Sequence, residues 1–251
     1  GATTNFRLAS ITKHLTALAI LMLIEDGRLT LDTRLNAILP QFPEYAERIS
    51  IQHLLQHQSG LPDYEPLVTR DQHPRIRDQG VVALLFEVSE LDFEPGTSYH
   101  YSNSGYAVLA VIVETITNQA FETFLQERIF NPSKMSQSVA FVQGQNEIPN
   151  RALGYTVREA EVKETDQSAY SAVLGDGGVY SSIADLTTWH RVGFGRALIS
   201  DRLFKAMMTP ALERYGFGWR IDQFEGHTRY HHSGSTSGFR NFIAHFPNID
   251  L

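Results

Sequence analysis

Apolar residues are most concentrated in one stretch near the start of the chain. Every residue from Ala17 to Ile24 is apolar, so this stretch lacks the polar face of a surface helix and predicts a helix packed on all sides. We expect the helix to cover Phe6–Gly27, because glycine accepts the left-handed conformation that often follows a helix. The apolar run is too short to span a bilayer. The pattern therefore predicts a buried central helix.

The rest of the pattern predicts more helices and then a strand-rich end. Periodicity and capping signals indicate helices over 49–56, 81–90, 107–117, 120–129, 183–192 and 201–208. Short β-type runs follow at 215–221, 228–232 and 239–246, and their short links imply an antiparallel sheet. A polar surface lid or rim is expected at 64–80, a glycine-rich turn at 175–182, and the pattern over 136–170 is weak.

Two residues at the start of the central helix suggest chemistry. Ser10 and Lys13 are three residues apart, so on a helix their side chains share a face. A serine needs a base within hydrogen-bond reach to act as a nucleophile, and a buried lysine can be that base. Free N–H groups at a helix start favour a developing alkoxide. One Ser-x-x-Lys match is nevertheless common by chance, so other residues must decide its meaning.

Composition describes an ordinary soluble protein and narrows the possible partners. The 251 residues are 42% hydrophobic with a net charge of -7, which gives no electrostatic footprint for nucleic acid or an anionic membrane. There is no cysteine, so disulfides, thiolate chemistry and cysteine-ligated zinc are excluded. Phosphate-binding loops of the Gly-x-x-x-x-Gly-Lys type are absent. We therefore expect a small-molecule or peptide substrate and no cofactor or metal, with the oligomeric state open.

His53 and His57 are one helical turn apart, a spacing that zinc ligands can use. No HExxH-type motif supplies a carboxylate partner. We prefer capping and packing for both.

Two later segments could complete a serine–lysine site. Tyr101 and Asn103 precede a helix, where a phenol could relay a proton and an amide could hold a substrate carbonyl; they could equally pack and cap that helix. Period-2 alternation places His232 and Gly234 on one face of a strand, although a solvated hairpin turn is the alternative.

These elements together resemble the serine β-lactamase and penicillin-binding-protein superfamily, in the class C-like branch that includes esterases and D-amino-acid peptidases. That superfamily carries Ser-x-x-Lys, Tyr-x-Asn and Lys-Thr-Gly in this order. The corresponding stretches here are Ser10–Lys13, Tyr101–Asn103 and His232–Gly234. The flanks FRLASITK, HLLQHQSGLPDY, YSNSGY, GDGGVYSSIADL and YGFGW are also typical of the branch, so the resemblance covers nearly the whole chain.

The resemblance implies an α+β fold, a function and a set of roles. It implies one β-lactamase-like unit over 1–251, with a helical lobe at about 10–210 and an antiparallel sheet lobe, flanked by helices, at about 211–251 plus 1–9. Ser10 would form an acyl-enzyme with Lys13 and Tyr101 as proton carriers. Asn103, His232 and Gly234 would bind substrate, and the N–H groups of Ser10 and Ser235 would form the oxyanion hole.

Two departures refine this expectation. His232 replaces the family's lysine, a fixed cation, and histidine at this place is common among the family's esterases and D-aminopeptidases, so these activities are favoured over efficient β-lactam hydrolysis. The family's additional strands at both ends are missing, so we expect part of a longer sequence with open sheet edges. The alternative is a non-catalytic penicillin-binding or sensor-type relative. The resemblance favours a periplasmic or secreted location, although no signal peptide is visible.

Overall fold

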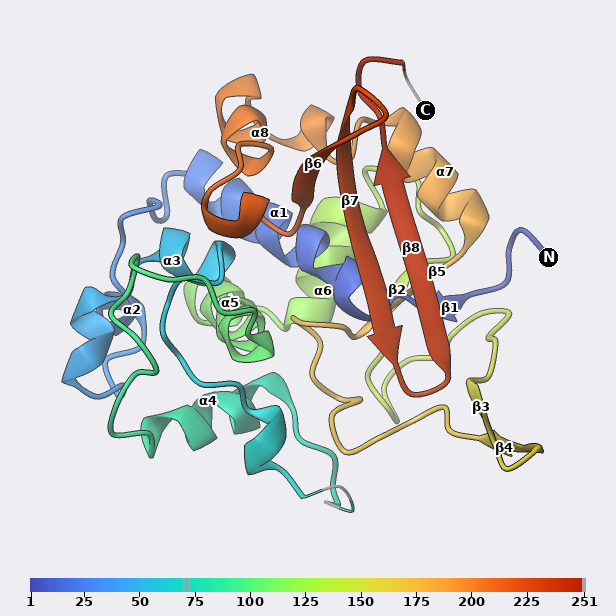
Figure 1. Cartoon of the computed structure of the whole chain (residues 1–251), viewed down its shortest axis with the longest axis horizontal. Helices are drawn as coiled ribbons and strands as arrows, with labels where there is room; N and C mark the ends of the chain where they lie inside the picture. Colours follow the sequence, from blue (N-terminus) through green and yellow to red (C-terminus); the bar gives the residue numbers. More distant parts are fainter. Residues whose placement is uncertain (70, 72, 250–251) are drawn as a thin grey trace.

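Helix α1 (Lys13–Glu25) runs through the middle of the protein, with the other elements arranged around it (Figure 1). The computed structural model describes residues 1–69, 71 and 73–249. Every residue of α1 from Lys13 to Leu23 is buried. Helices α5 (Asn103–Thr117), α6 (Phe121–Leu125) and α8 (Asp201–Met207) all contact it. The prediction of a helix packed on all sides is confirmed.

The predicted start of that helix is wrong. Phe6 and Arg7 form strand β1, which pairs with a later strand, and Ala9–Thr12 form the 3-10 turn η1 before α1 begins. Ala9 has a φ of 49°, in the left-handed region, which interrupts the helical path. Ser10 therefore lies on a tight turn that leads into the helix.

The remaining predicted helices are present, with shifted bounds. They are α3 (Ile51–Leu55), α4 (Asp78–Phe86) and α7 (Ile183–Arg191), besides α5, α6 and α8. A π-type turn, Gln126–Phe130, continues α6. A short helix, α2 (Leu35–Ile38), was not predicted. Helix α5 starts at Asn103 rather than 107; the first three residues, Asn103, Ser104 and Gly105, carry no apolar side chain and so gave no apolar periodicity.

In the described part of the chain the strands form three antiparallel sheets, which confirms the antiparallel prediction and the α+β class. The first joins β1 (Phe6–Arg7), β5 (Val179–Ser181) and β2 (Val139–Ala140), and the second joins β3 (Tyr155–Arg158) and β4 (Glu161–Glu164). The third joins β6 (Arg220–Phe224), β7 (His227–Thr236) and β8 (Phe239–His245).

The predictions for three stretches need correction. The stretch 179–181, predicted as part of a glycine-rich turn, is strand β5, and the weakly patterned stretch 136–170 contains β2, β3 and β4. The run predicted at 215–221 enters a strand only at Arg220. Tyr215 forms a single bridge to Arg220, so the chain turns between them instead of extending.

The β7–β8 hairpin lies over the start of α1 and packs on η1 (Figure 1). Strand β6 pairs with β7 only as far as His231, so the rest of β7 faces the turn that carries Ser10. The approach is close at Gly234. A Cβ there would lie 2.0 Å from the carbonyl oxygen of Leu8, so only glycine lets β7 pass this near the turn.

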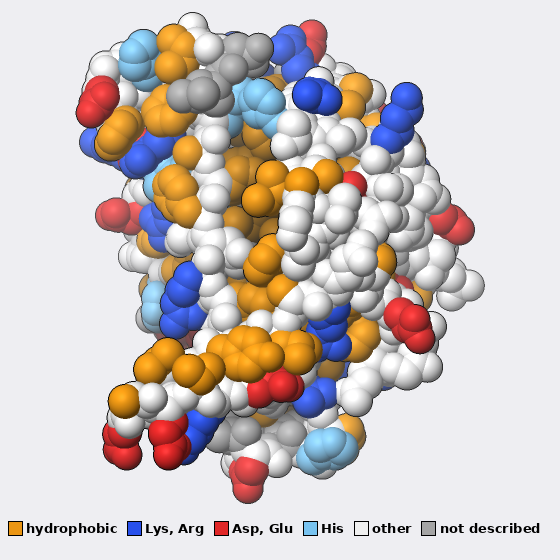
Figure 2. All heavy atoms as spheres, turned by 90° about the vertical axis from the view of Figure 1, so that its right-hand side faces the viewer, with side chains coloured by type: hydrophobic (Ala, Val, Ile, Leu, Met, Phe, Trp, Pro, Cys, Tyr) orange, Lys and Arg blue, Asp and Glu red, His pale blue; other side chains and the backbone are white. Residues whose placement is uncertain are grey.

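One face of the protein is rich in apolar side chains (Figure 2). It includes the edge strand β8, which pairs only with β7 among the described strands, and the β3–β4 hairpin. Phe242 of β8 and Val157 and Val162 of the hairpin are exposed. None of the described helices is long and apolar enough to cross a membrane alone. Helix α5 and the following helical stretch, Phe121–Phe130, reach that length and apolar character only together, and the pair is bent by 83°.

Candidate active site

Ser10 and Lys13 are brought together by the turn η1 and the first residue of α1. The Lys13 amine donates to Ser10 Oγ at 3.2 Å, to Asn103 Oδ1 at 2.7 Å and to the Asp176 carbonyl oxygen at 2.9 Å. Lys13 is 0% exposed, whereas Ser10 is partly exposed. The three acceptors come from three distant parts of the chain, so the fold holds this lysine in one position.

Asn103, the first residue of α5, joins Lys13 to a group of acidic residues. Its side-chain NH₂ donates to Glu65 at 2.9 Å, and its backbone N–H donates to Asp63 at 3.0 Å. The backbone N–H of Ser102, the N-cap residue, donates to the ring of His57 at 3.2 Å. These contacts fix the side chain of Asn103 between the lysine and the carboxylates.

Tyr101 lies beside the lysine. The Lys13 amine is 5.0 Å from the centre of the Tyr101 ring, and the ring packs against His57 at a centroid distance of 4.3 Å. The ring of His232 is 6.2 Å away. The two later segments predicted to complete the site therefore meet the Ser-x-x-Lys turn in space.

On strand β7, His232 and Gly234 are buried and Ser233 between them is exposed, as period-2 alternation predicts. Nδ1 of His232 lies 2.7 Å from the Ser233 carbonyl oxygen, which can only accept, so Nδ1 carries the proton. Nε2 then accepts from the Tyr215 hydroxyl at 3.1 Å. Burial, together with the nearby charge of Lys13, lowers the pKa of His232 to about 3. His232 is therefore neutral at pH 7.

Two cavities meet at Ser10. One has a volume of about 370 Å³ and the other about 60 Å³, and both are lined by Ser10, Asn103, Ser235 and Glu65. The larger one also reaches Tyr101, His232 and Ser233, and Arg220. Ser10 and Ser235, the predicted oxyanion-hole residues, thus line the same space. A substrate in these cavities has the Ser10 hydroxyl within reach.

The electrostatics of the site depend on three carboxyl groups, of which Asp63 and Glu65 are partly buried and Asp176 is buried. Burial raises the pKa values of Asp63, Glu65 and Asp176, while the charge of Lys13 lowers them. Tyr64 donates a hydrogen bond of 2.8 Å to Asp176 Oδ2. When protonated, Lys13 is therefore a cation shared by these three carboxyl groups, and the charge of Arg7 also acts on Asp176.

Sequence reasoning missed Glu65 and Arg220. Glu65 fell in the stretch 64–80, which was predicted as a surface lid or rim, and the chain does line the cavity there. Arg220 follows the YGFGW motif, and the strand predicted there did not indicate that its side chain faces the site. The only signal was proximity to family-typical motifs, since both residues lie within a few positions of one.

The two histidines that could have bound zinc have other roles. His53 forms a capping box with Ser50, whose hydroxyl accepts the His53 backbone N–H at 3.2 Å, so the capping interpretation is confirmed for it. His57 is buried among tyrosine rings, including Tyr106 and Tyr215. Within residues 1–69, 71 and 73–249, no three histidine, aspartate or glutamate side chains converge on a metal site.

Residues 1–251 match the family model described as Beta-lactamase. The chain belongs to this family. It is 31% identical to penicillin-binding protein 4* of Bacillus subtilis over 96% of this chain and 58% of that protein. It is 29% identical to a D-aminopeptidase of Gluconobacter oxydans over 99% of this chain and 48% of that protein. The chain thus spans about half the length of these relatives.

A solved structure also superposes on this chain. The D-amino acid amidase of Ochrobactrum anthropi SV3, in complex with L-phenylalanine amide, gives a TM-score of 0.84 at 25% identity, covering 99% of this chain and 74% of the amidase. The predicted resemblance to the class C-like branch is consistent with all three similarities.

The buried histidines predict that the protein loses stability in acid. Burial lowers the pKa of both His14 and His232 to about 3 and that of His57 well below its usual value of 6.5. Below pH 6.5 the unfolded chain binds protons that the folded protein does not. As the pH falls further, each of these histidines lowers the free energy of unfolding by about 1.4 kcal/mol per pH unit.

Urea unfolding at pH 7.5, 6 and 5 measures how the free energy of unfolding changes with pH. In His232→Gln this change should be smaller by the contribution of one histidine. Asp78 acts in the opposite direction, because burial raises its pKa to about 8, and its contribution is lost as the pH rises through that value. A change with pH that is the same in His232→Gln as in the wild type would show that His232 is not held neutral, because the raised carboxyl pKa values contribute equally to both proteins.

Proposed function

We propose that this chain carries the active site of a serine hydrolase that cleaves an amide or ester through an acyl-enzyme on Ser10. The observation that carries the proposal is the 3.2 Å contact between Lys13 and Ser10 Oγ at the wall of a cavity. Ser10 Oγ attacks the acyl carbon, and the bond to the leaving amine or alcohol breaks. The serine proton passes to Lys13 and then to the leaving group, and water releases the acyl group.

The contacts of Lys13 suit the role of base. A neutral amine has two N–H groups and one lone pair. Asn103 Oδ1 and the Asp176 carbonyl oxygen can accept the two N–H groups, which leaves the lone pair directed at the Ser10 hydroxyl. Tyr101, whose ring lies beside Lys13, is the proposed second proton carrier. The N–H groups of Ser10 and Ser235 are the proposed oxyanion hole.

For the substrate we propose an amide or short peptide of a D-amino acid with a free ammonium group. Glu65 offers a carboxylate to that ammonium where the two cavities meet. Arg220 offers a cation to a carboxylate or carbonyl at the other part of the larger cavity. The similarities to a D-aminopeptidase and a D-amino acid amidase support this class. Neutral His232 disfavours efficient β-lactam hydrolysis.

A penicillin-binding relative without turnover is the second candidate, because a penicillin-binding protein at 31% identity is among the similar proteins. Incubation with a penicillin, followed by intact mass spectrometry over time, separates the two. A stable adduct on Ser10 together with no turnover of D-alanyl peptides, D-amino-acid amides or short-chain esters supports the second candidate. Turnover of any of these supports the hydrolase.

Replacing Glu65 by glutamine should weaken the selection for a free ammonium group. A charged hydrogen bond contributes about 1.5–3 kcal/mol, so kcat/KM for a D-amino-acid amide should fall by about 10- to 100-fold. The N-acetylated form of the same amide is the control substrate, since it presents no charge to Glu65. An equal loss for both amides would contradict ammonium recognition by Glu65.

A further inference from the structure

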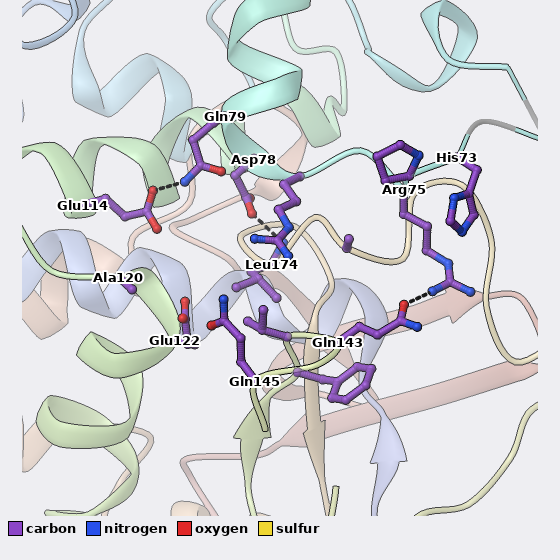
Figure 3. A pocket seen from close by; sticks show the side chains of 15 residues that line it. His73, Arg75, Asp78, Gln79, Glu114, Ala120, Glu122, Gln143, Gln145 and Leu174 are labelled. Atoms are coloured by element: carbon purple, nitrogen blue, oxygen red, sulfur yellow. Dashed lines mark hydrogen bonds between the residues drawn. The ribbon is translucent and has the colours of Figure 1, made fainter. Parts of the chain in front are cut away.

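Asp78 is a buried carboxylate outside the cavities at Ser10. It is the first residue of α4 and is 4% exposed. Its two oxygens accept the backbone N–H groups of Leu174 at 2.8 Å and Gly175 at 2.9 Å. Figure 3 shows Asp78 beside Leu174 in the wall of a separate groove of about 420 Å³, whose lining shares no residue with the cavities at Ser10.

The two N–H groups that Asp78 holds belong to the loop that orients Lys13. Directly after Gly175, the carbonyl oxygen of Asp176 accepts from Lys13 at 2.9 Å. The carbonyl oxygen of Gly175 accepts from the hydroxyl of Thr16 at 2.7 Å. Thr16 and Lys13 both belong to α1, so they hold the loop from one side and Asp78 holds it from the other.

The loop has little room to adjust if one of these contacts is lost. A Cβ on Gly175 would lie 2.2 Å from the carbonyl oxygen of Tyr106, so the backbone is pressed against α5. On the far side of Asp176, Arg7 Nε donates to the carbonyl oxygen of Gly177 at 3.1 Å. The position of the Asp176 carbonyl oxygen therefore depends on contacts made from several elements at once.

Burying the carboxyl group of Asp78 is energetically unfavourable, so a purely structural contact is a poor explanation for this residue. Among the ion pairs of residues 1–69, 71 and 73–249, none includes Asp78, and burial raises its pKa to about 8 although two N–H groups stabilise its charge. The carboxyl group nevertheless has a specific advantage here. Above that pKa it is a carboxylate and both of its oxygens accept, whereas an asparagine turns its NH₂ group toward one of the two backbone donors at every pH, so the variants are compared at pH 9.

We propose that Asp78 is a positioning residue for the proton transfer at Ser10. By holding the N–H groups of Leu174 and Gly175, it fixes the Asp176 carbonyl oxygen, one of the two acceptors that direct the Lys13 lone pair at the Ser10 hydroxyl. Asp78 thus acts on the reaction through the loop without touching the substrate. This proposal rests on the proposed function, in which Lys13 is the base.

The test is the rate at which a fluorophosphonate labels Ser10 in Asp78→Asn. In this reaction the Ser10 oxygen bonds to phosphorus, fluoride leaves, and the serine proton goes to Lys13. We expect the limiting rate constant, per folded molecule, to fall at least 10-fold while the half-saturating probe concentration changes little. The folded fraction and the melting temperature are measured on the same samples.

Asp185→Asn is the matched control. Asp185 is also 4% exposed, and it accepts the backbone N–H of Gln137 at 2.8 Å and the hydroxyl of Ser138 at 2.7 Å, both outside the loop that orients Lys13. We expect this variant to lose stability and to keep the wild-type labelling rate. Asp78→Ser, which is smaller and keeps one acceptor, is measured beside Asp78→Asn.

Each outcome decides the proposal. Slow labelling of every Asp78 variant that folds, with Asp185→Asn unaffected, supports it. Wild-type labelling rates in a folded Asp78 variant overturn it, and so does failure of both Asp78 variants to fold, which would make Asp78 a residue of the fold alone. If wild-type Ser10 takes up no probe, it is the proposed function that fails.

Discussion

Replacing Ser10 by alanine is expected to remove hydrolysis and covalent labelling together. The acyl-enzyme needs an oxygen nucleophile, and no other group occupies that position beside Lys13. Because the nucleophile and its base act as a unit, the loss in kcat should be about 10³-fold or more. Turnover of p-nitrophenyl butyrate and intact mass after fluorophosphonate treatment measure the two effects separately.

Ser233→Ala is the matched control for this substitution. Ser233 lines the same larger cavity as Ser10, and its exposed side chain lies on the opposite face of β7 from His232. We expect this variant to hydrolyse and label at nearly the wild-type rate. Retention of activity in Ser10→Ala would mean that a different residue is the nucleophile.

The sequence predicted the members of the site better than it predicted their surroundings. Ser10 and Lys13 are three residues apart, and the 3-10 turn that replaces the predicted first helical turn still brings their side chains together. The meeting with Tyr101, Asn103 and His232 followed only from the family motifs, since no local pattern relates residues so far apart. Their arrangement around Lys13 depends on the packing of α5 and β7 against the start of α1.

Other contacts had no residue-type signal at all. The Asp176 acceptor for Lys13 is a backbone carbonyl oxygen, which every residue carries, so no sequence pattern can mark it. Gly234 was predicted to bind substrate. The structure gives it a definite steric role, because a side chain would strike the backbone of Leu8. That requirement arises from tertiary packing and becomes visible only with both segments in place.

The errors in secondary structure have a similar cause. Strands β1 and β2 are two residues long, too short for alternation to be recognised. They exist because both pair with β5, which itself follows the glycine-rich turn. Helix α1 was predicted well from Lys13 onward because burial on all sides leaves a strong signal in composition. Its supposed first turn instead became β1 and η1, through pairing that the local sequence does not encode.

Replacing Lys13 by methionine is expected to be as damaging as the loss of Ser10. Methionine matches the length and buried character of lysine but provides neither a base nor a charge. We expect kcat to fall by about 10³-fold, because the Ser10 proton then has no acceptor. The variant should also be less stable, since Asp63, Glu65 and Asp176 lose the cation whose charge lowers their pKa values. Thermal unfolding and p-nitrophenyl butyrate turnover measure the two losses.

Lys13→Arg separates the base from the charge. A guanidinium keeps the positive charge beside the three carboxyl groups but does not lose its proton at accessible pH, so it cannot receive the proton of Ser10. If Lys13 is the base, the arginine variant should recover part of the lost stability and none of the lost activity. Substantial turnover by Lys13→Arg would mean that the charge at this position is sufficient. Proton transfer would then have to be assigned to another titratable group in the cavity, of which Tyr101 lies beside residue 13.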